Sequence, residues 1–186
     1  SLLDKAIAAD SLPLCLQYKA DWLYEKGRYP EAFDCYASLG GTDLAQDGVY
    51  ANASQCQYVM KNYDVAIELM DSAVKHSDSG EPEYAAPLIF RRGLMTTYSL
   101  GSTFYYIRSQ AETKCKMYQQ ALNDLEKAIS IAPDYILYYF EKGVLCYRLN
   151  LLEEAAGALE QAKKLDDSIA DVYYLLGCVY SKTGNR

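Results

Sequence analysis

The sequence predicts an all-α protein built as a solenoid of antiparallel helical hairpins. Small and apolar residues recur with a period of about 34 residues, at Ala121, Leu125 and Ala128 and again at Ala155, Leu159 and Ala162. Gly143 and Gly177, each within an apolar run, are separated by the same interval. A fixed period of this length is the signature of a repeat architecture, in which each unit buries its apolar face on the next. At 51% hydrophobic residues, the chain has enough apolar material for such a core.

The period divides the chain into repeats within one domain, residues 1–186. The predicted units are 1–11, the end of a preceding repeat; 14–41 and 46–80, two repeats; 83–101, an irregular or incomplete repeat; 102–133 and 134–167, two further repeats; and 168–186, the first helix of another. In the unit 14–41, Leu16, Ala20 and Leu23 share one face of a first helix that ends near Gly27. Pro30 then falls in the first turn of the second helix, where its missing N–H costs little.

The later units follow the same plan. In the unit 46–80, Tyr63, Ala66 and Met70 mark the inner face of the second helix at spacings of three and four. Further helices are predicted at 134–149, 151–165 and 171–182. Both ends of the sequence fall inside repeats, which indicates a window on a longer array.

The period breaks between Ala66 and Ala121, whose separation is neither one period nor two. We expect a helix at 83–100, ended by Gly101-Ser102, and then another first helix at 103–115. A partner helix of about 15 residues is then missing. Either the solenoid contains an odd helix and bends there, or residues of the protein are absent from the sequence.

The chain resembles the tetratricopeptide repeat (TPR) family along most of its length. The resemblance is carried by Leu176-Gly177 followed by Tyr180, and by Tyr118-Gln119-Gln120-Ala121 leading to Ala128 and Pro133. It implies a right-handed superhelix whose first helices line a concave groove. The positions that face the groove in this family are here Gln17, Asp21, Tyr24, Ala51, Gln55, Tyr58, Phe90, Leu94, Tyr98, Tyr106, Gln110, Phe140, Val144, Tyr147, Tyr174 and Cys178.

Composition excludes several other classes of function. The formal net charge of -7 argues against binding to the phosphate backbone of nucleic acids. The longest apolar runs are too short to span a membrane, and no signal peptide is recognisable. The six cysteines include no C-x-x-C pair and are accompanied by one histidine, so no metal or cofactor site is predicted. Unpaired cysteines favour a reducing compartment such as the cytoplasm, without deciding it.

The predicted function is a non-catalytic scaffold that binds a peptide or protein segment in an aromatic groove, because tyrosine side chains recur as binding anchors. A self-associating structural component and an accessory domain of a larger enzyme remain alternatives. Catalytic constellations are not predicted: Glu153-Glu154 are helix-start residues and His76 has no nucleophile nearby in sequence. The carboxylate-binding set of chaperone-type TPR domains is not expected either, since its positions hold Gln17, Asp21, Asn52, Pro87 and Arg91.

Overall fold

A computed structural model describes residues 13–39, 47–78 and 100–184. These residues form helices and no strand. The helices are α2 (Pro13–Glu25), α3 (Tyr29–Leu39), α4 (Asp47–Val59), α5 (Tyr63–Asp78), α6 (Leu100–Lys114), α7 (Tyr118–Ile131), α8 (Ile136–Arg148), α9 (Leu152–Leu165) and α10 (Ala170–Thr183). We call α2, α4, α6, α8 and α10 the first helices, and α3, α5, α7 and α9 the second helices.

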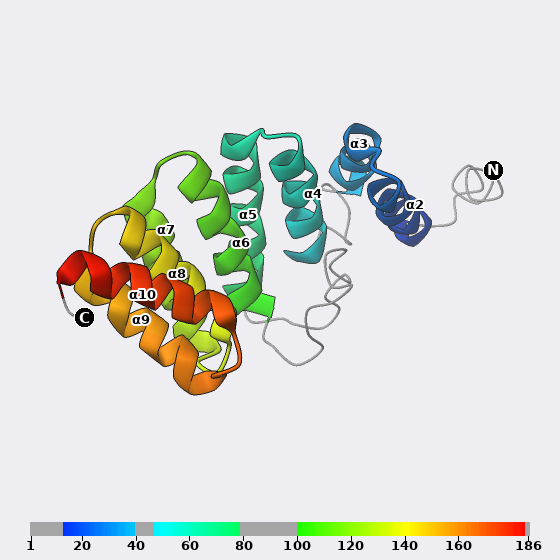
Figure 1. Ribbon diagram of the computed structural model, residues 1–186. Coiled ribbons are helices and arrows are strands. Elements are labelled where there is room, and N and C mark those ends of the chain that lie inside the picture. The colour runs from blue at the N-terminus through cyan, green and yellow to red at the C-terminus, as the bar shows by residue number, and fades with distance from the viewer. Residues whose placement is uncertain (1–12, 40–46, 79–99, 185–186) are drawn as a thin grey trace.

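The helices are stacked in the order of the sequence, with α2 and α10 at opposite ends of the stack (Figure 1). Each helix packs against the one before it and the one after it. The helix axes turn along the stack, so that α4 and α5 run up the view in Figure 1 while α9 and α10 run across it. The predicted all-α solenoid of helical hairpins is therefore confirmed.

Small residues set how closely the two helices of each hairpin approach. On the second helices, Ala32, Ala66, Ala121 and Ala155 are at most 1% exposed. On α8, a Cβ atom added at Gly143 would lie 2.6 Å from the Cγ atom of Leu159 in α9. In the α4–α5 hairpin the corresponding residue is Ser54, whose hydroxyl donates a hydrogen bond to the carbonyl oxygen of Ala66 at 2.7 Å. At these positions the helices approach too closely for a side chain larger than the glycine, alanine or serine that is present.

Each first helix ends in the same left-handed turn. Among the described residues, positive φ occurs at Gly27, Lys61, Lys116, Asn150 and Gly184, which follow α2, α4, α6, α8 and α10 at equivalent places. Around Lys61, the backbone N–H of Asn62 donates a hydrogen bond to the carbonyl oxygen of Gln57 at 2.9 Å. The backbone N–H of Lys61 donates another to the carbonyl oxygen of Tyr58 at 3.0 Å. This pair of bonds is the Schellman motif, which satisfies the last carbonyls of the helix and reverses the chain.

The break in the period does not interrupt the stack. α5 packs directly against α6, as α3 packs against α4 and α7 against α8. Met70 of α5 lies in one buried cluster with Phe104 and Tyr105 of α6. The expectation that a partner helix is missing stays a prediction, because it concerns residues outside those that the structure describes. The surplus over one period falls between Asp78 and Leu100. The helix predicted at 83–100 lies, apart from its last residue, outside the described residues.

The sequence predicted that Gly101-Ser102 would end a helix. Both residues lie instead in the first turn of α6. Ser102 is fully buried there, and its hydroxyl oxygen lies 3.2 Å from the donating hydroxyl of Tyr138 in α8. Glycine often follows a helix, and the prediction rested on that preference. Packing between α6 and α8 outweighs it here.

A charged cluster joins α5, α6 and α7. The guanidinium of Arg108 binds Asp124 in α7 at 2.6 Å and Asp71 in α5 at 2.7 Å. Glu112 lies one turn further along α6, is only 5% exposed, and its Oε2 atom has no hydrogen-bond partner. Burial, with a smaller contribution from the charge of Asp124, raises the pKa of Glu112 to about 7.

Substitution of Gly143 by alanine should lower the free energy of unfolding by about 1 to 3 kcal/mol, because the new methyl group would overlap Leu159. The matched control is Gly177→Ala at the equivalent place in α10, where a Cβ atom meets nothing within 4 Å. That change should be stabilising by about 0.5 to 1 kcal/mol through helix propensity. Urea unfolding of both variants measures the difference, and equal effects would contradict the role assigned to Gly143.

Lys61→Gly should raise the free energy of unfolding by about 1 kcal/mol, because glycine adopts the left-handed conformation without the steric cost that a Cβ atom imposes. Lys75→Gly is the control, since Lys75 is an exposed residue inside α5. There glycine should instead cost about 1 kcal/mol. Thermal unfolding followed by circular dichroism would separate the two, and a loss of stability in both would refute the argument.

Glu112→Gln should stabilise the protein in a pH-dependent way. Below the ordinary carboxyl pKa of about 4.3, Glu112 is protonated in both the folded and unfolded states, and the substitution should have little effect. Between that value and about 7 the unfolded state loses its proton first, so the stability of the parent falls as pH rises. At pH 8, above both pKa values, the variant should be more stable by about 3 to 4 kcal/mol. Denaturant titrations at pH 4 and pH 8 test this, and a difference independent of pH would contradict it.

Candidate partner-binding groove

A pocket of about 190 Å³ opens between three consecutive first helices. One lining residue comes from α4, four each from α6 and α8, and one from α7 beneath them. They are Tyr58, Ser109, Gln110, Thr113, Lys114, Leu125, Glu141, Val144, Leu145 and Arg148. The small residue Ser109 is buried and stands one period before Gly143, the residue of the close contact between α8 and α9.

Three of the residues predicted to line the groove meet in this pocket, namely Tyr58, Gln110 and Val144. The side-chain amide of Gln110 donates a hydrogen bond to the hydroxyl oxygen of Tyr106 at 2.8 Å. The ring of Tyr106 also packs against that of Tyr138, with centroids 5.3 Å apart. Tyr106 is therefore half-buried and supports Gln110 more than it offers free surface.

The predicted groove residues of α2 and α4 are largely engaged within their own hairpins. Tyr24 packs edge-on against Tyr29, with ring centroids 5.1 Å apart, and Tyr58 packs in the same way against Tyr63 at 5.4 Å. Burial raises the pKa of Tyr24 to about 12. Each pair joins the last turn of a first helix to the start of the second helix. All four tyrosines are half-buried.

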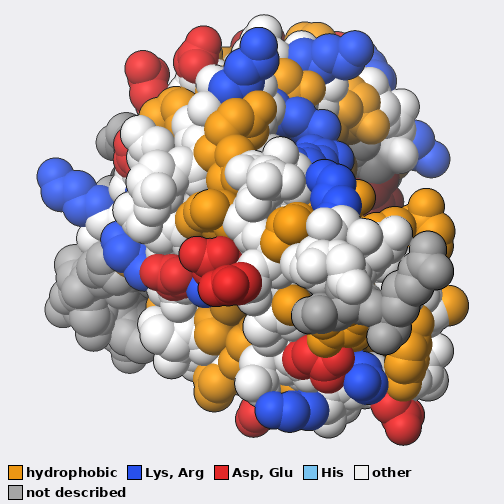
Figure 2. All heavy atoms as spheres, turned by 60° about the vertical axis from the view of Figure 1, so that its left-hand side comes forward, with side chains coloured by type: hydrophobic (Ala, Val, Ile, Leu, Met, Phe, Trp, Pro, Cys, Tyr) orange, Lys and Arg blue, Asp and Glu red, His pale blue; other side chains and the backbone are white. Residues whose placement is uncertain are grey.

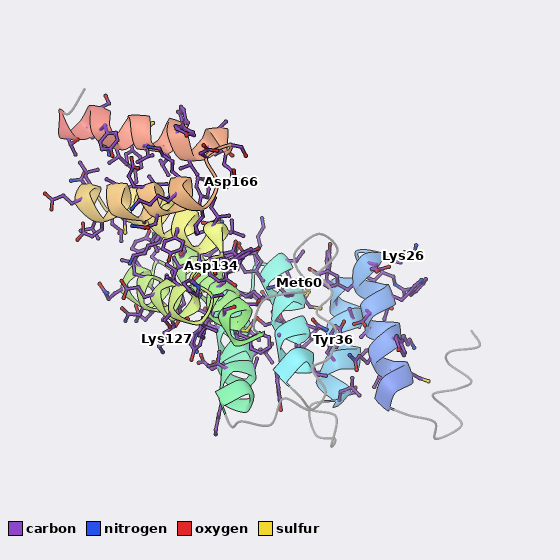
Figure 3. The ribbon with its side chains drawn as sticks, turned by 90° about the horizontal axis from the view of Figure 1, so that it is seen from below. Lys26, Tyr36, Met60, Lys127, Asp134 and Asp166 are labelled. Carbon is purple, nitrogen blue, oxygen red and sulfur yellow. The ribbon has the colours of Figure 1, made fainter. Side chains whose placement is uncertain are left out.

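Two polar residues of α2 differ from the expectation of an open groove. Gln17 is only 8% exposed, so it offers almost no surface to a partner. Asp21 accepts a hydrogen bond from the hydroxyl of Tyr36 on α3, a residue marked in Figure 3. Burial raises the pKa of Asp21, and the bond from Tyr36 partly offsets that effect. Gln55 on α4 is half-buried.

Towards the other end of the stack the predicted residues range from half-buried to exposed. Phe140 is half-buried against the C-terminal core cluster. Tyr147 lies under the ammonium group of Lys182, which is 4.3 Å from the ring centroid, and Tyr174 is 75% exposed. Three further predicted groove residues, Phe90, Leu94 and Tyr98, lie outside the described residues.

The pocket carries charges that the sequence prediction did not include. Glu141 is half-buried in it, and burial raises the pKa of its carboxyl group against the opposing effects of Arg148 and Lys114. Burial, together with Tyr63 and Glu141, also raises the pKa of Tyr58. Lys114 and Arg148 occupy equivalent positions one period apart, which is the sequence signal that could have revealed them. On the face shown in Figure 2, Lys and Arg side chains form a strip running down from the upper edge, beside separate groups of Asp and Glu.

Two members of the expected carboxylate-binding set, Pro87 and Arg91, lie outside the described residues. Of the described members, Asn52 is fully buried and Gln17 is 8% exposed. None of the described members carries a basic side chain that could bind a carboxylate.

Residues 13–39, 47–78 and 100–184 contain no group of three or more His, Cys, Asp or Glu side chains placed to hold a metal ion. Within the same ranges, no helix combines the length and apolar character that a bilayer crossing requires. Cys56 and Cys146 are buried, and the other four cysteines are half-buried.

Comparison with known proteins agrees with this geometry. Residues 102–135 match the tetratricopeptide repeat model. No curated protein matches the sequence significantly. Among solved structures, MamA has a TM-score of 0.72 and 20% identity, covering 90% of this chain and 85% of its own. YrrB, described as a TPR protein with an unusual peptide-binding site, has a TM-score of 0.73 and 18% identity, covering 100% of this chain and 86% of its own.

A third structure is the first TPR of Spaghetti (RPAP3) bound to the HSP90 peptide SRMEEVD. Its TM-score is 0.60 at 16% identity, with coverage of 77% of this chain and 97% of its own. Identities this low establish the fold and do not transfer a ligand. Residues 102–135 are therefore a tetratricopeptide repeat, and the chain has the fold of the TPR proteins.

Proposed function

We propose that this protein is a non-catalytic scaffold that captures an extended segment of a partner protein in the groove formed by its first helices. The observation that carries the proposal is the pocket shared by α4, α6 and α8. A pocket that draws its walls from successive repeats runs along the stack, and an extended peptide that crosses the same helices can place one side chain in it.

The chemistry of the pocket supports recognition of a peptide. Val144 and the edge of Tyr58 offer apolar contact, while Gln110 and Thr113 offer hydrogen-bonding groups. Aromatic edges already fixed by packing, as Tyr58 is against Tyr63, lose little rotamer freedom when a ligand binds. YrrB and the RPAP3 domain, which share the fold, are described with a peptide-binding site and a bound peptide respectively.

Selection of a random-peptide display library on the immobilised protein tests this function. Selected peptides should bind the parent and should lose at least about tenfold in affinity with Val144→Arg, because the larger side chain would fill the pocket. Gln161→Arg introduces the same charge at an exposed position on α9, a second helix, and should leave binding unchanged. Peptides that bind the parent and both variants equally would show that the groove is not the site.

A further inference from the structure

Three of the first helices end in a basic side chain at the same position of the repeat. Lys114, Arg148 and Lys182 lie in the last turns of α6, α8 and α10, each one period after the one before. All three are exposed. We call this set the basic ladder. Its members are far apart in sequence, so they form no charge run, but residues of α6 and α8 line one pocket and α8 contacts α10.

The basic ladder is continuous with the groove. Lys114 and Arg148 line the pocket that also contains Tyr58 and Gln110. Lys182 reaches back from α10 to the ring of Tyr147 in α8, the residue directly before Arg148. Neither Lys114 nor Arg148 forms an ion pair within the described parts of the chain, so both charges are open to a ligand.

Helix stability alone does not account for these charges. Cations at helix C-termini are favoured by the helix dipole, and this would apply to every first helix. The equivalent positions in α2 and α4 hold Glu25 and Val59, and neither helix has a basic residue in its last turn. The basic side chains are thus confined to the three consecutive first helices of the C-terminal half.

We infer that the basic ladder selects an acidic peptide segment, whose Asp or Glu side chains pair with Lys114, Arg148 and Lys182 as the segment crosses α6, α8 and α10. This inference rests on the proposed function and adds the chemistry of the partner. The protein as a whole carries a charge of -7, so a local basic surface is the place where an acidic segment meets attraction instead of repulsion.

The inference can also be tested at Glu141, whose charge is opposite in sign to those of the basic ladder. It lies in the same pocket as Lys114 and Arg148 and forms no ion pair with either. An acidic ligand held by those two residues therefore approaches a like charge. Removing the charge at Glu141 should strengthen binding, whereas removing it at Lys114 or Arg148 should weaken binding.

The test uses fluorescein-labelled synthetic versions of the peptides selected on the parent, each paired with a copy in which Asp and Glu are replaced by Asn and Gln. Fluorescence anisotropy measures their affinity for the parent and for K114Q, R148Q, K182Q and E141Q. The selected peptides should be rich in Asp and Glu. Each of K114Q, R148Q and K182Q should weaken binding about two- to fivefold. A variant that combines these three changes should weaken it more than about tenfold. E141Q should strengthen it about twofold or more.

The neutral copies should bind weakly and should respond to none of the four changes. Circular dichroism should show unchanged helicity, since all four side chains reach the surface or the pocket. Peptides that are neutral or basic, lose affinity with Val144→Arg and ignore the basic ladder would overturn the inference and leave the groove as the binding site. If no peptide depends on Val144, the proposed function fails and the inference fails with it.

Discussion

The close approach of the two helices in each hairpin is the constraint on which this structure depends. Where Gly143 meets Leu159, no side chain larger than hydrogen fits on α8, and alanines such as Ala121 and Ala155 serve the same contact from the second helices. This contact fixes how each first helix is rotated about its axis. Because the rotation is the same in every repeat, residues one period apart face the same way, and a groove surface can be built from side chains that are remote in sequence.

The sequence predicted the parts of the fold that follow from periodicity. It placed the hairpins, the small residues of their contacts and most helix ends within two or three residues. It was wrong at Gly101-Ser102, because a glycine was interpreted by local preference while the packing of Ser102 against Tyr138 decided the outcome. The surplus before α6 falls within 79–99, outside the described residues, so the expectation of a missing helix there stays a prediction.

The groove was predictable as a side of the stack but not residue by residue. Periodicity says which positions lie on the first helices, and three predicted residues do meet in the pocket. Whether a tyrosine is free or packed depends on the turn that follows, as for Tyr58 against Tyr63. Lys114 and Arg148 were missed because charge was assessed along the sequence, where they stand alone, and not along the period.

The ion pairs of Arg108 have a consequence for how stability is shared along the stack. Arg108 of α6 binds Asp124 within its own hairpin and Asp71 of α5 in the hairpin before it. In a solenoid each unit contacts only its neighbours, so contacts of this kind are what couple the stability of one hairpin to that of the next. A change at Arg108 should therefore be felt in both the α4–α5 and the α6–α7 hairpin.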